Sequence, residues 1–314
     1  MFFGLMRCVT LKSLQGTSVL SCLSVAFVSK RIAYACRPCS HISSAHVLQS
    51  GNTMKEMTAD DERLARQVIG LLELFALNTD DTEQRIVGIC RRACTPVGPV
   101  AAVSVQQRFV CLARTTLDRL QARHIKVVAV VNFPHGSSNV QSVIAQVRAA
   151  LMAGADEIDV VYPFRALLGG DRQPGLAMIS ACSALCAGQV RLTATLETGD
   201  LRDSQMILDA CRDAIVSGAD FIKTSTGKAA THVTPQAARI MLESIADVGG
   251  QVGLKVAGGI RTFDEARVYM ALVRARFGLQ WISAGRLRLG GSSLLDDLLA
   301  RLGLLESHGG GAGF

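Results

Sequence analysis

The sequence predicts an α/β fold, a single (β/α)8 TIM barrel, and three observations lead to this prediction. Between residues 58 and 306, short β-branched runs alternate with longer helical patterns. The central runs are almost continuously apolar, which is typical of parallel strands covered on both faces. Eight strands with their helices in this span match the ~250 residues of such barrels. A doubly wound open sheet is the structural alternative, but no G-x-G-x-x-G motif follows the first strand.

The eight predicted strands are runs of four to seven residues rich in Val, Leu and Ile. In chain order they cover residues 71–77, 100–105, 126–132, 157–161, 190–196, 220–223, 253–256 and 281–284. Helical patterns fill the intervals, among them residues 142–153, 203–217, 235–248 and 263–277. Thr234 and Thr262 precede Pro or acidic residues and are expected to cap helices. Gly154 and Gly218 fall where two of these helices should end.

The net charge of the 314-residue chain is +7, from 33 Lys plus Arg and 26 Asp plus Glu, but it is unevenly distributed. Residues 1–55 hold six basic side chains and no acidic one, and the first carboxylate is Glu56. Residues 56–314 therefore carry 27 basic and 26 acidic side chains. A body this close to neutral does not match a nucleic-acid groove, so we expect no nucleic-acid partner. No run reaches the ~18 apolar residues of a membrane helix, so we expect no membrane partner.

The N-terminal segment is distinct from the rest of the chain in composition. Its basic, acid-free and Ser-rich sequence is typical of an organelle transit peptide, for example a mitochondrial one. A secretory signal and a later translation start at Met54 or Met57 are the alternatives. We expect a cytoplasmic protein unless this segment directs import. The predicted parts are an N-terminal extension at residues 1–55, the barrel at 56–306 and a flexible glycine-rich tail at 307–314.

The ten cysteines do not form a disulfide framework. Those at 90 and 94, and at 182 and 186, lie four residues apart in apolar helical patterns, where Cys acts as a small hydrophobe. The C-x-x-C at 36–39 has no second pair at zinc spacing. We therefore expect no metal site.

Two lysines mark the ends of neighbouring predicted strands. Lys223 follows Phe221-Ile222, and Lys255, 32 residues later, follows the apolar run 252–254. Because barrel chemistry gathers at the C-terminal ends of strands, we expect the two lysines side by side. A buried ammonium is costly unless it is paired, and a second ammonium beside it depresses its pKa. The result is an amine partly neutral near pH 7, the species that attacks a carbonyl to form a Schiff base. The alternative is structural: each lysine reaches the rim or pairs with a carboxylate.

Schiff-base chemistry also needs a carboxylate that moves protons, and Asp159 is the first candidate. In the run 157–161, Asp159 points into the barrel if Ile158 and Val160 face the helices. A buried Asp there needs a partner, which Lys223 or Lys255 would supply. Glu197, at another strand end, is the second choice, whereas His135 is interpreted as a turn residue.

Three glycine-containing loops fall on the same predicted rim. They contain Gly227-Lys228, Gly258-Gly259-Ile260-Arg261 and Gly290-Gly291-Ser292-Ser293. Glycines let backbone N–H groups approach an anion, and a helix N-terminus adds a favourable dipole. Barrels often bind phosphate with the loops after strands seven and eight. Three such loops, with Lys228 and Arg261 as counter-charges, predict a phosphate site.

Four segments resemble deoxyribose-phosphate aldolase motifs: residues 131–136, 155–161, 221–228 and 254–261. The resemblance covers roughly residues 58–305 and is specific, since FIKTSTGK and KVAGGIRT occur in the family's order. It implies a barrel that reversibly cleaves 2-deoxy-D-ribose 5-phosphate to acetaldehyde and glyceraldehyde 3-phosphate without metal or other cofactor. Lys223 matches the nucleophile, Lys255 the lysine that keeps it deprotonated, and Asp159 the acid–base carboxylate that works through water. The phosphate cradle matches Gly227, Lys228, Gly258, Gly259, Arg261, Ser292 and Ser293.

Four positions depart from the pattern of some family members. Glu73 replaces an Asp, Ser104 a Cys, Thr193 a Lys and Phe314 a terminal Tyr. These departures bear on rate and substrate preference. The alternatives to the implied activity are an aldolase for a longer donor and a non-catalytic barrel that binds sugar phosphates. We expect a small-molecule sugar phosphate as partner, and a homodimer or other homo-oligomer is compatible with the sequence.

Overall fold

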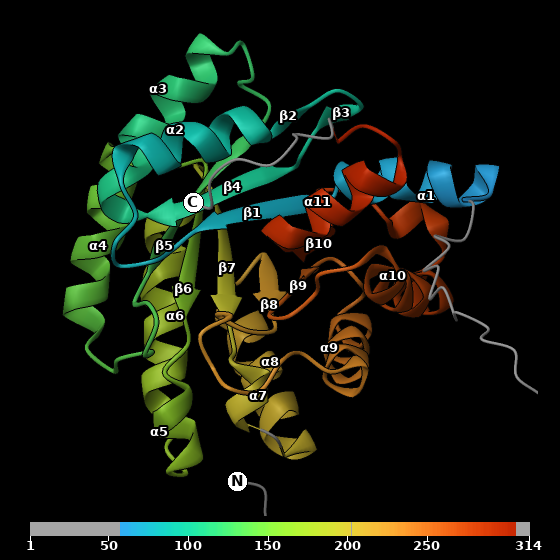
Figure 1. Ribbon diagram of the computed structural model, residues 1–314. Coiled ribbons are helices and arrows are strands. Elements are labelled where there is room, and N and C mark those ends of the chain that lie inside the picture. The colour runs from blue at the N-terminus through green and yellow to red at the C-terminus, as the bar shows by residue number, and fades with distance from the viewer. Residues whose placement is uncertain (1–56, 202, 306–314) are drawn as a thin grey trace, which may run out of the picture. The chain divides into compact units, whose positions relative to one another are not determined.

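Eight strands of the computed structural model, which describes residues 57–201 and 203–305, form one closed parallel barrel (Figure 1). Each strand pairs with the next one along the chain, and the last closes against the first. This confirms the predicted fold and excludes the open sheet. The barrel strands are β1 (Leu72–Ala76), β4 (Ala102–Gln106), β5 (Lys126–Val131), β6 (Glu157–Val161), β7 (Arg191–Thr195), β8 (Phe221–Lys223), β9 (Gly253–Ala257) and β10 (Leu287–Gly290).

Helices surround the barrel and connect its strands (Figure 1). They are α1 (Ala59–Ile69), α2 (Glu83–Arg92), α3 (Val110–Arg119), α4 (Val140–Met152), α5 (Phe164–Leu168), α6 (Gln173–Cys186), α7 (Thr198–Leu201), α8 (Ser204–Val216), α9 (Pro235–Asp247), α10 (Phe263–Phe277) and α11 (Ser292–Arg301). Short 3-10 turns, η1 (Gln107–Phe109) and η2 (Leu279–Trp281), and a hairpin of β2 (Cys94–Thr95) and β3 (Gly98–Pro99) complete the elements.

The predicted helix boundaries follow from their end residues. Thr234 accepts the Ala237 N–H at the start of α9, and Thr262 forms a capping box with Glu265 at the start of α10. Such caps satisfy N–H groups that the first helical turn leaves without partners. Gly154 and Gly218 follow α4 and α8 with φ of 88° and 95°, a conformation that glycine adopts without steric cost.

The eighth strand was predicted at residues 281–284, and this prediction is wrong. The strand lies at β10, Leu287–Gly290. Trp281 instead ends η2, stacks on Phe277 with ring centroids 4.6 Å apart and donates its indole N–H to the Gly250 carbonyl. The apolar residues at 281–284 therefore pack outside the barrel. The strand that closes the barrel contains Arg288, a charged residue whose carboxylate partners come from distant parts of the sequence.

Strand alternation places charged side chains inside the barrel. In β6, Glu157 and Asp159 accept hydrogen bonds across the barrel interior from lysines on β9 and β8, while Ile158 and Val160 belong to the apolar cluster under the helices. All five residues of β6 are buried. The two faces of each strand therefore serve different purposes, since the outward face packs the helices and the inward face builds a polar interior.

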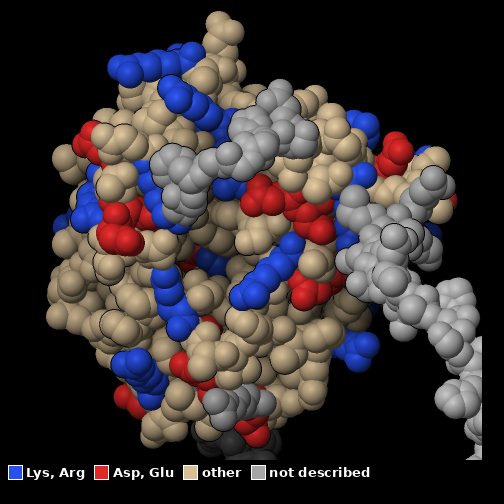
Figure 2. Space-filling model, viewed as in Figure 1, with Lys and Arg blue, Asp and Glu red and all other residues tan. Residues whose placement is uncertain are grey.

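The predicted extension at 1–55 lies outside the described residues, as does the tail at 307–314. The assignments of import, flexibility and localisation made for these segments therefore stay predictions. Among the described residues, no helix has the length and apolar content needed to cross a membrane. Figure 2 shows Lys and Arg interspersed with Asp and Glu on the face it presents, as the near-neutral composition of the barrel leads one to expect.

Candidate active site

Lys223 and Asp159 form a buried ion pair inside the barrel. Lys223 is the last residue of β8, and its Nζ donates to Asp159 Oδ2 at 2.8 Å. Their side chains are 3% and 0% exposed. Thr195, on the intervening strand β7, donates its hydroxyl to the other carboxylate oxygen, Oδ1, at 2.5 Å. The inward orientation predicted for Asp159 is therefore confirmed, and Lys223 is the partner that it was expected to need.

Lys255 lies beside Lys223, as the sequence predicted, but in different surroundings. The two residues are in register on the adjacent strands β8 and β9. Lys255 Nζ lies 3.1 Å from both Glu73 Oε2 and Glu157 Oε2. Strand β9 continues for two residues beyond Lys255, so this lysine sits inside the strand, whereas Lys223 ends its own.

Arg288 completes the charged cluster below the two lysines. Its guanidinium donates to Glu157 Oε1 at 2.7 Å and approaches Glu73 Oε2 at 3.5 Å. Ser104 donates to Glu73 Oε1 at 2.6 Å. The cluster thus contains three cations and three carboxylates: Lys255 and Arg288 share Glu73 and Glu157, and the pair of Lys223 and Asp159 lies beside them. Its members are Lys223, Lys255, Arg288, Asp159, Glu73 and Glu157.

The electrostatics of the cluster favour its charged forms. Burial by itself raises the pKa of Glu73, but the neighbouring cations, Lys255 first, outweigh burial and lower this pKa from 4.5 to about 2. Burial likewise raises the pKa of Glu157, and Lys255 and Arg288 bring it below its ordinary value. Burial lowers the pKa of Lys255, but Glu73 and Glu157 raise it above 10.5.

The pKa of Lys255 is therefore not depressed, which agrees with its expected role as the charged neighbour of Lys223. Its two carboxylates more than compensate for its burial, so Lys255 is an ammonium at neutral pH. This is the state in which it can disfavour a second positive charge on the neighbouring lysine.

Two aromatic rings lie against the lysine amines. Lys223 Nζ is 4.7 Å from the centroid of the Phe75 ring, and Lys255 Nζ is 5.1 Å from that of Phe221. Glycines make room for both rings: a Cβ on Gly290 would lie 2.6 Å from the Phe75 ring, and one on Gly253 would lie 2.3 Å from that of Phe221. Glycine within these strands therefore serves the close packing of the barrel interior.

The three predicted glycine loops converge at the C-terminal end of the barrel. Gly227, Gly258 and Gly259 have φ of 79°, 102° and 105°, which glycine adopts without steric cost. A Cβ on Gly258 would lie 3.9 Å from the Cα of Gly227, so the loops after β8 and β9 touch. A Cβ on Gly291 would lie 2.6 Å from the Ile260 carbonyl, which brings in the loop after β10.

The charged and hydroxyl groups of the predicted phosphate cradle are placed less uniformly. Ser292 begins α11 and accepts the Phe75 N–H at 3.4 Å, while Ser293 is exposed. Arg261 is exposed in the loop after β9. Lys228 Nζ instead donates to Asn78 Oδ1 at 2.7 Å, in the loop after β1. The structure therefore brings the three loops together, but it holds the ammonium of Lys228 at Asn78 and leaves Arg261 and Ser293 exposed.

Glu197 and His135 have other surroundings. Glu197 is buried after β7 with φ of 57°, and its Oε2 accepts both the N–H and the hydroxyl of Thr226. It thus anchors the loop that contains Gly227. His135 is exposed in a turn after β5, as its interpretation as a turn residue predicted. Within the described residues, no group of three or more His, Cys, Asp or Glu side chains could hold a metal ion.

Reasoning from the sequence missed the roles of Glu157 and Arg288 and treated Glu73 only as a departure from a family pattern. Each is a charged residue that alternates with buried apolar ones, as in Leu72-Glu73-Leu74. For Glu73 and Glu157, this alternation could have indicated side chains that point into the barrel. For Arg288 it could not, because the eighth strand was predicted at residues 281–284, before Arg288 in the sequence.

A protein-family model described as DeoC/LacD family aldolase matches residues 68–288. This match spans well over half of the chain and includes every member of the buried cluster. The chain belongs to the DeoC/LacD aldolase family. The resemblance of the four motifs to an aldolase family is thereby confirmed.

Solved structures agree with this family and fold. A protein from Toxoplasma gondii ME49, provisionally assigned as a deoxyribose-phosphate aldolase, is 25% identical, with a TM-score of 0.73 over 80% of this chain and 100% of its own. An aldolase called QR15 is also 25% identical, with a TM-score of 0.63 over 76% and 99%. The deoxyribose phosphate aldolase of Aeropyrum pernix, at 19% identity and TM-score 0.62 over 79% and 100%, shares the fold.

Proposed function

We propose that this protein is a deoxyribose-phosphate aldolase. It cleaves 2-deoxy-D-ribose 5-phosphate reversibly to acetaldehyde and D-glyceraldehyde 3-phosphate, in the breakdown of deoxyribose. The observation that carries the proposal is the buried pair of Lys223 and Asp159, with the charged Lys255 in register with Lys223 on the adjacent strand. The family match and the sugar-phosphate aldolases among the similar structures support it.

Lys223 acts as the nucleophile. Its free amine attacks C1 of the open-chain aldehyde to give a carbinolamine, which loses water to form the imine. Asp159, 2.8 Å from the amine, is placed to take and return the protons of these steps. The charge on Lys255 disfavours protonation of its neighbour, which keeps part of Lys223 in the reactive form.

The C2–C3 bond breaks in the next step. The C3 hydroxyl loses its proton, the C3–O bond becomes the carbonyl of glyceraldehyde 3-phosphate, and the electron pair of the C2–C3 bond moves into the imine to give an enamine. Protonation at C2 and hydrolysis then release acetaldehyde and regenerate Lys223. Thr193 is in register with Asp159, and its buried hydroxyl has no hydrogen-bond partner among the described residues, so it suits a water that relays the proton.

The converging loops bind the phosphate in this proposal. Gly227, Gly258 and Gly259 allow their backbone N–H groups to approach a phosphate closely. The N-terminus of α11 at Ser292 adds a favourable dipole, and Arg261 and Lys228 supply counter-charge. Lys228 would have to leave Asn78 to take part, since its ammonium donates to that side chain.

Trapping with borohydride tests the proposal. Reduction in the presence of acetaldehyde should leave a two-carbon adduct on Lys223, located by mass spectrometry of peptides. Lys126, which is exposed, is the internal control and should stay unmodified. Cleavage of deoxyribose 5-phosphate, followed by a coupled assay for glyceraldehyde 3-phosphate, should be lost in Lys223→Ala. An unmodified Lys223 or an active Lys223→Ala enzyme would end the proposal.

The same assays separate the two alternatives. A longer donor aldehyde that is trapped and turned over faster than acetaldehyde would identify an aldolase for another substrate. Tight binding of deoxyribose 5-phosphate without an adduct would identify a barrel that only binds sugar phosphates. We also propose a homo-oligomer, since the Aeropyrum pernix relative is described as a tetramer. The molar mass measured by light scattering, as the protein elutes from a size-exclusion column, would test this.

A further inference from the structure

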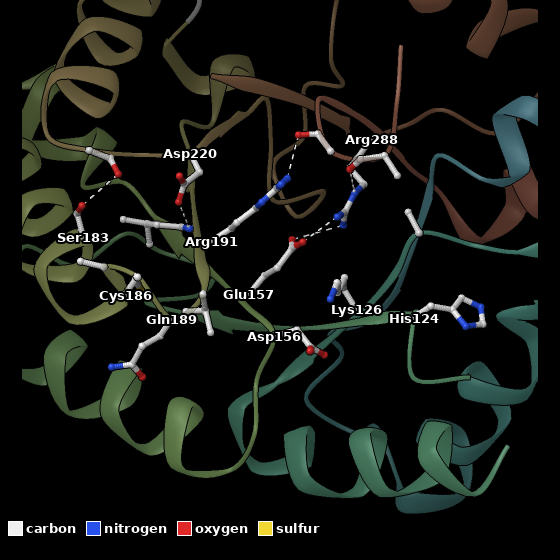
Figure 3. A pocket seen from close by; sticks show the side chains of 18 of the residues that line it. His124, Lys126, Asp156, Glu157, Ser183, Cys186, Gln189, Arg191, Asp220 and Arg288 are labelled. Atoms are coloured by element: carbon white, nitrogen blue, oxygen red, sulfur yellow. Dashed lines mark hydrogen bonds and ion pairs between the residues drawn. The ribbon is translucent and has the colours of Figure 1, made fainter. Parts of the chain in front are cut away.

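A second cavity lies at the end of the barrel away from the proposed active site. It has a volume of about 750 Å³ and is lined by residues at the beginnings of strands. Lys126, Glu157 and Arg191 are the first residues of β5, β6 and β7, and all three line it (Figure 3). Its volume falls in the ~300–1,000 Å³ range of small-molecule sites.

Two cations in this cavity lack carboxylate partners. Lys126 is exposed, and its ammonium has no hydrogen bond or ion pair with any described residue. Arg191 is also exposed and donates Nη1 to the Gly285 carbonyl at 3.0 Å, but it forms no ion pair in the described part of the chain. Both therefore retain positive charge and hydrogen-bond donors that a ligand could use.

Three carboxylates also line the cavity, and two of them already have cationic partners. Asp156 accepts from Arg114 at 2.8 Å and from the Val127 N–H, and Glu157 is held by Arg288. Asp220 accepts the Leu192 N–H at 2.8 Å and has no ion pair among the described residues. Asp220 thus neutralises neither free cation and offers an acceptor for a hydroxyl or amino group.

The charged residues that line the cavity come from neighbouring strands. Glu157 and Arg191 are in register on β6 and β7, and Asp220 is bonded to the residue that follows Arg191. In Figure 3, Arg191 lies between Asp220 and Glu157, and Lys126 faces the same space from β5. One small ligand can therefore meet an ammonium, a guanidinium and a carboxylate.

We propose that this cavity binds a small phosphomonoester whose organic part carries hydroxyl or amino groups. The phosphate dianion balances the charges of Lys126 and Arg191, and the guanidinium fork suits two phosphate oxygens. Asp220 accepts a hydrogen bond from the organic part. The ligand class is thus that of sugar phosphates and nucleoside monophosphates, bound at the opposite end of the barrel from the aldolase chemistry.

The floor of the cavity connects this site to the lysine pair. Arg288 and Glu157 line the cavity, and Glu157 also contacts Lys255 at 3.1 Å. An anion bound there adds negative charge beside this cluster and so favours protonated amines inside the barrel. If the proposed function holds, the bound phosphomonoester therefore lowers the fraction of Lys223 that can attack a carbonyl, which makes it an inhibitor of the aldolase.

The binding test uses adenosine 5′-monophosphate and inorganic phosphate as probes, titrated calorimetrically into the full-length protein. Arg191→Gln and Lys126→Gln should each weaken binding of the nucleotide about tenfold, since each removes one charge-assisted contact. Arg239→Gln, which removes an exposed arginine on α9 outside the cavity, is the matched control and should bind as the wild type does.

Arg191→Lys distinguishes a lost contact from a misfolded variant, because it keeps the charge and should recover part of the affinity. Equal binding by the wild type, Arg191→Gln and Lys126→Gln would overturn the proposal, as would the absence of saturable binding at millimolar nucleotide. Phosphate binding that is lost when Ser292 or Gly259 is substituted, but not when Arg191 or Lys126 is, would place the phosphate in the cradle. That result would also overturn the proposal.

Asp220→Asn tests the recognition of the organic part. The substitution keeps an acceptor for the Leu192 N–H but removes the negative charge beside the phosphate. Inorganic phosphate should then bind at least as tightly as to the wild type, and the advantage of the nucleotide over inorganic phosphate should shrink. An unchanged advantage would remove Asp220 from the site.

The link to the active site has a separate readout. At saturating deoxyribose 5-phosphate, where competition at the cradle is overcome, the nucleotide should slow cleavage by the wild type but not by Arg191→Gln. An equal response of the two proteins would disprove the link. If the protein cleaves no deoxyribose 5-phosphate, the proposed function fails while the binding titrations still decide the cavity, so the two failures are distinguishable.

Discussion

Lys223 and Lys255 are neighbours in register, yet the barrel gives them opposite surroundings. Lys223 has one carboxylate, Asp159, and ends its strand at the side where the loops converge. Lys255 has two carboxylates, Glu73 and Glu157, lies within its strand and has its pKa raised. The same residue type is thus a candidate nucleophile on one strand and a fixed positive charge on the next.

Burial alone does not decide the pKa of Lys255. Both amines are almost fully buried and both lie over an aromatic ring, so desolvation and cation–π contact do not separate them. For Lys255, the two carboxylates Glu73 and Glu157 outweigh burial and raise the pKa. Five predictions test this comparison, in order of decreasing expected effect.

Removing the single carboxylate of Lys223 should have the largest effect. Asp159→Asn should lower kcat for deoxyribose 5-phosphate cleavage by about 10²–10⁴-fold, because no group remains to move protons next to the amine. Steady-state assays with the exposed Asp60→Asn as control measure it. Wild-type turnover in Asp159→Asn would show that the ion pair is structural.

Removing the charge of Lys255 should change the pH at which the enzyme works. In Lys255→Leu the neighbouring ammonium no longer disfavours protonation of Lys223, so the acidic limb of the rate profile should move to higher pH by about one unit or more. Lys255→Arg keeps the charge and should leave the limb in place. A profile that is the same in all three proteins would contradict the role assigned to Lys255.

Removing one of the two carboxylates of Lys255 should destabilise the fold. Glu73→Gln leaves Lys255 and Arg288 sharing Glu157, and the loss of a buried ionic partner costs about 3 kcal/mol of unfolding free energy. Urea denaturation measures it. Ser104→Ala, which removes only a hydrogen bond to Glu73, should cost about 1 kcal/mol.

The depressed pKa of Glu73 also sets a pH dependence. A carboxylate with a folded-state pKa of about 2 and an ordinary value of 4.5 contributes stability that is complete above pH 4.5 and is lost as the pH falls toward 2. Urea midpoints at pH 5, 3.5 and 2.5 should therefore fall more steeply for the wild type than for Glu73→Gln. Parallel curves would show that Glu73 is not held ionised.

Removing the hydrogen-bond partner of the exposed Lys228 should have the smallest effect on stability, in contrast to removing a partner of the buried lysines. The contact of Lys228 with Asn78 lies at the surface, so Asn78→Ala should change the unfolding free energy by less than about 1 kcal/mol. Urea denaturation checks this. A loss comparable to that of Glu73→Gln would mean that the contact between the loops after β1 and β8 holds the mouth of the barrel together.

Much of the molecule could be read from residue patterns. The alternation of apolar runs with helical stretches specified the barrel, because strands covered on both faces must be apolar and helices must bury one side. The inward orientation of Asp159 followed from its place between Ile158 and Val160. The pairing of Lys223 with Lys255 followed from their spacing of one strand–helix unit.

The eighth strand and the ionic cluster could not be read in this way. Residues 281–284 are apolar enough for a strand, but the stacking of Trp281 on Phe277 uses them outside the barrel. Arg288 within β10 is acceptable only because Glu157 and Glu73, from strands 131 and 215 residues away in sequence, meet it inside. No local pattern contains that compensation.

Residue patterns alone were enough to single out Lys223, Lys255 and Asp159 as candidates, since a lysine or aspartate in an apolar strand is costly wherever it lies and must be partnered. The surroundings of each lysine depend on the tertiary structure. The pKa of Lys255 is raised because closure of the barrel brings two carboxylates to it, whereas Lys223 has one. Coulomb energy depends on distance through space, and the fold sets those distances.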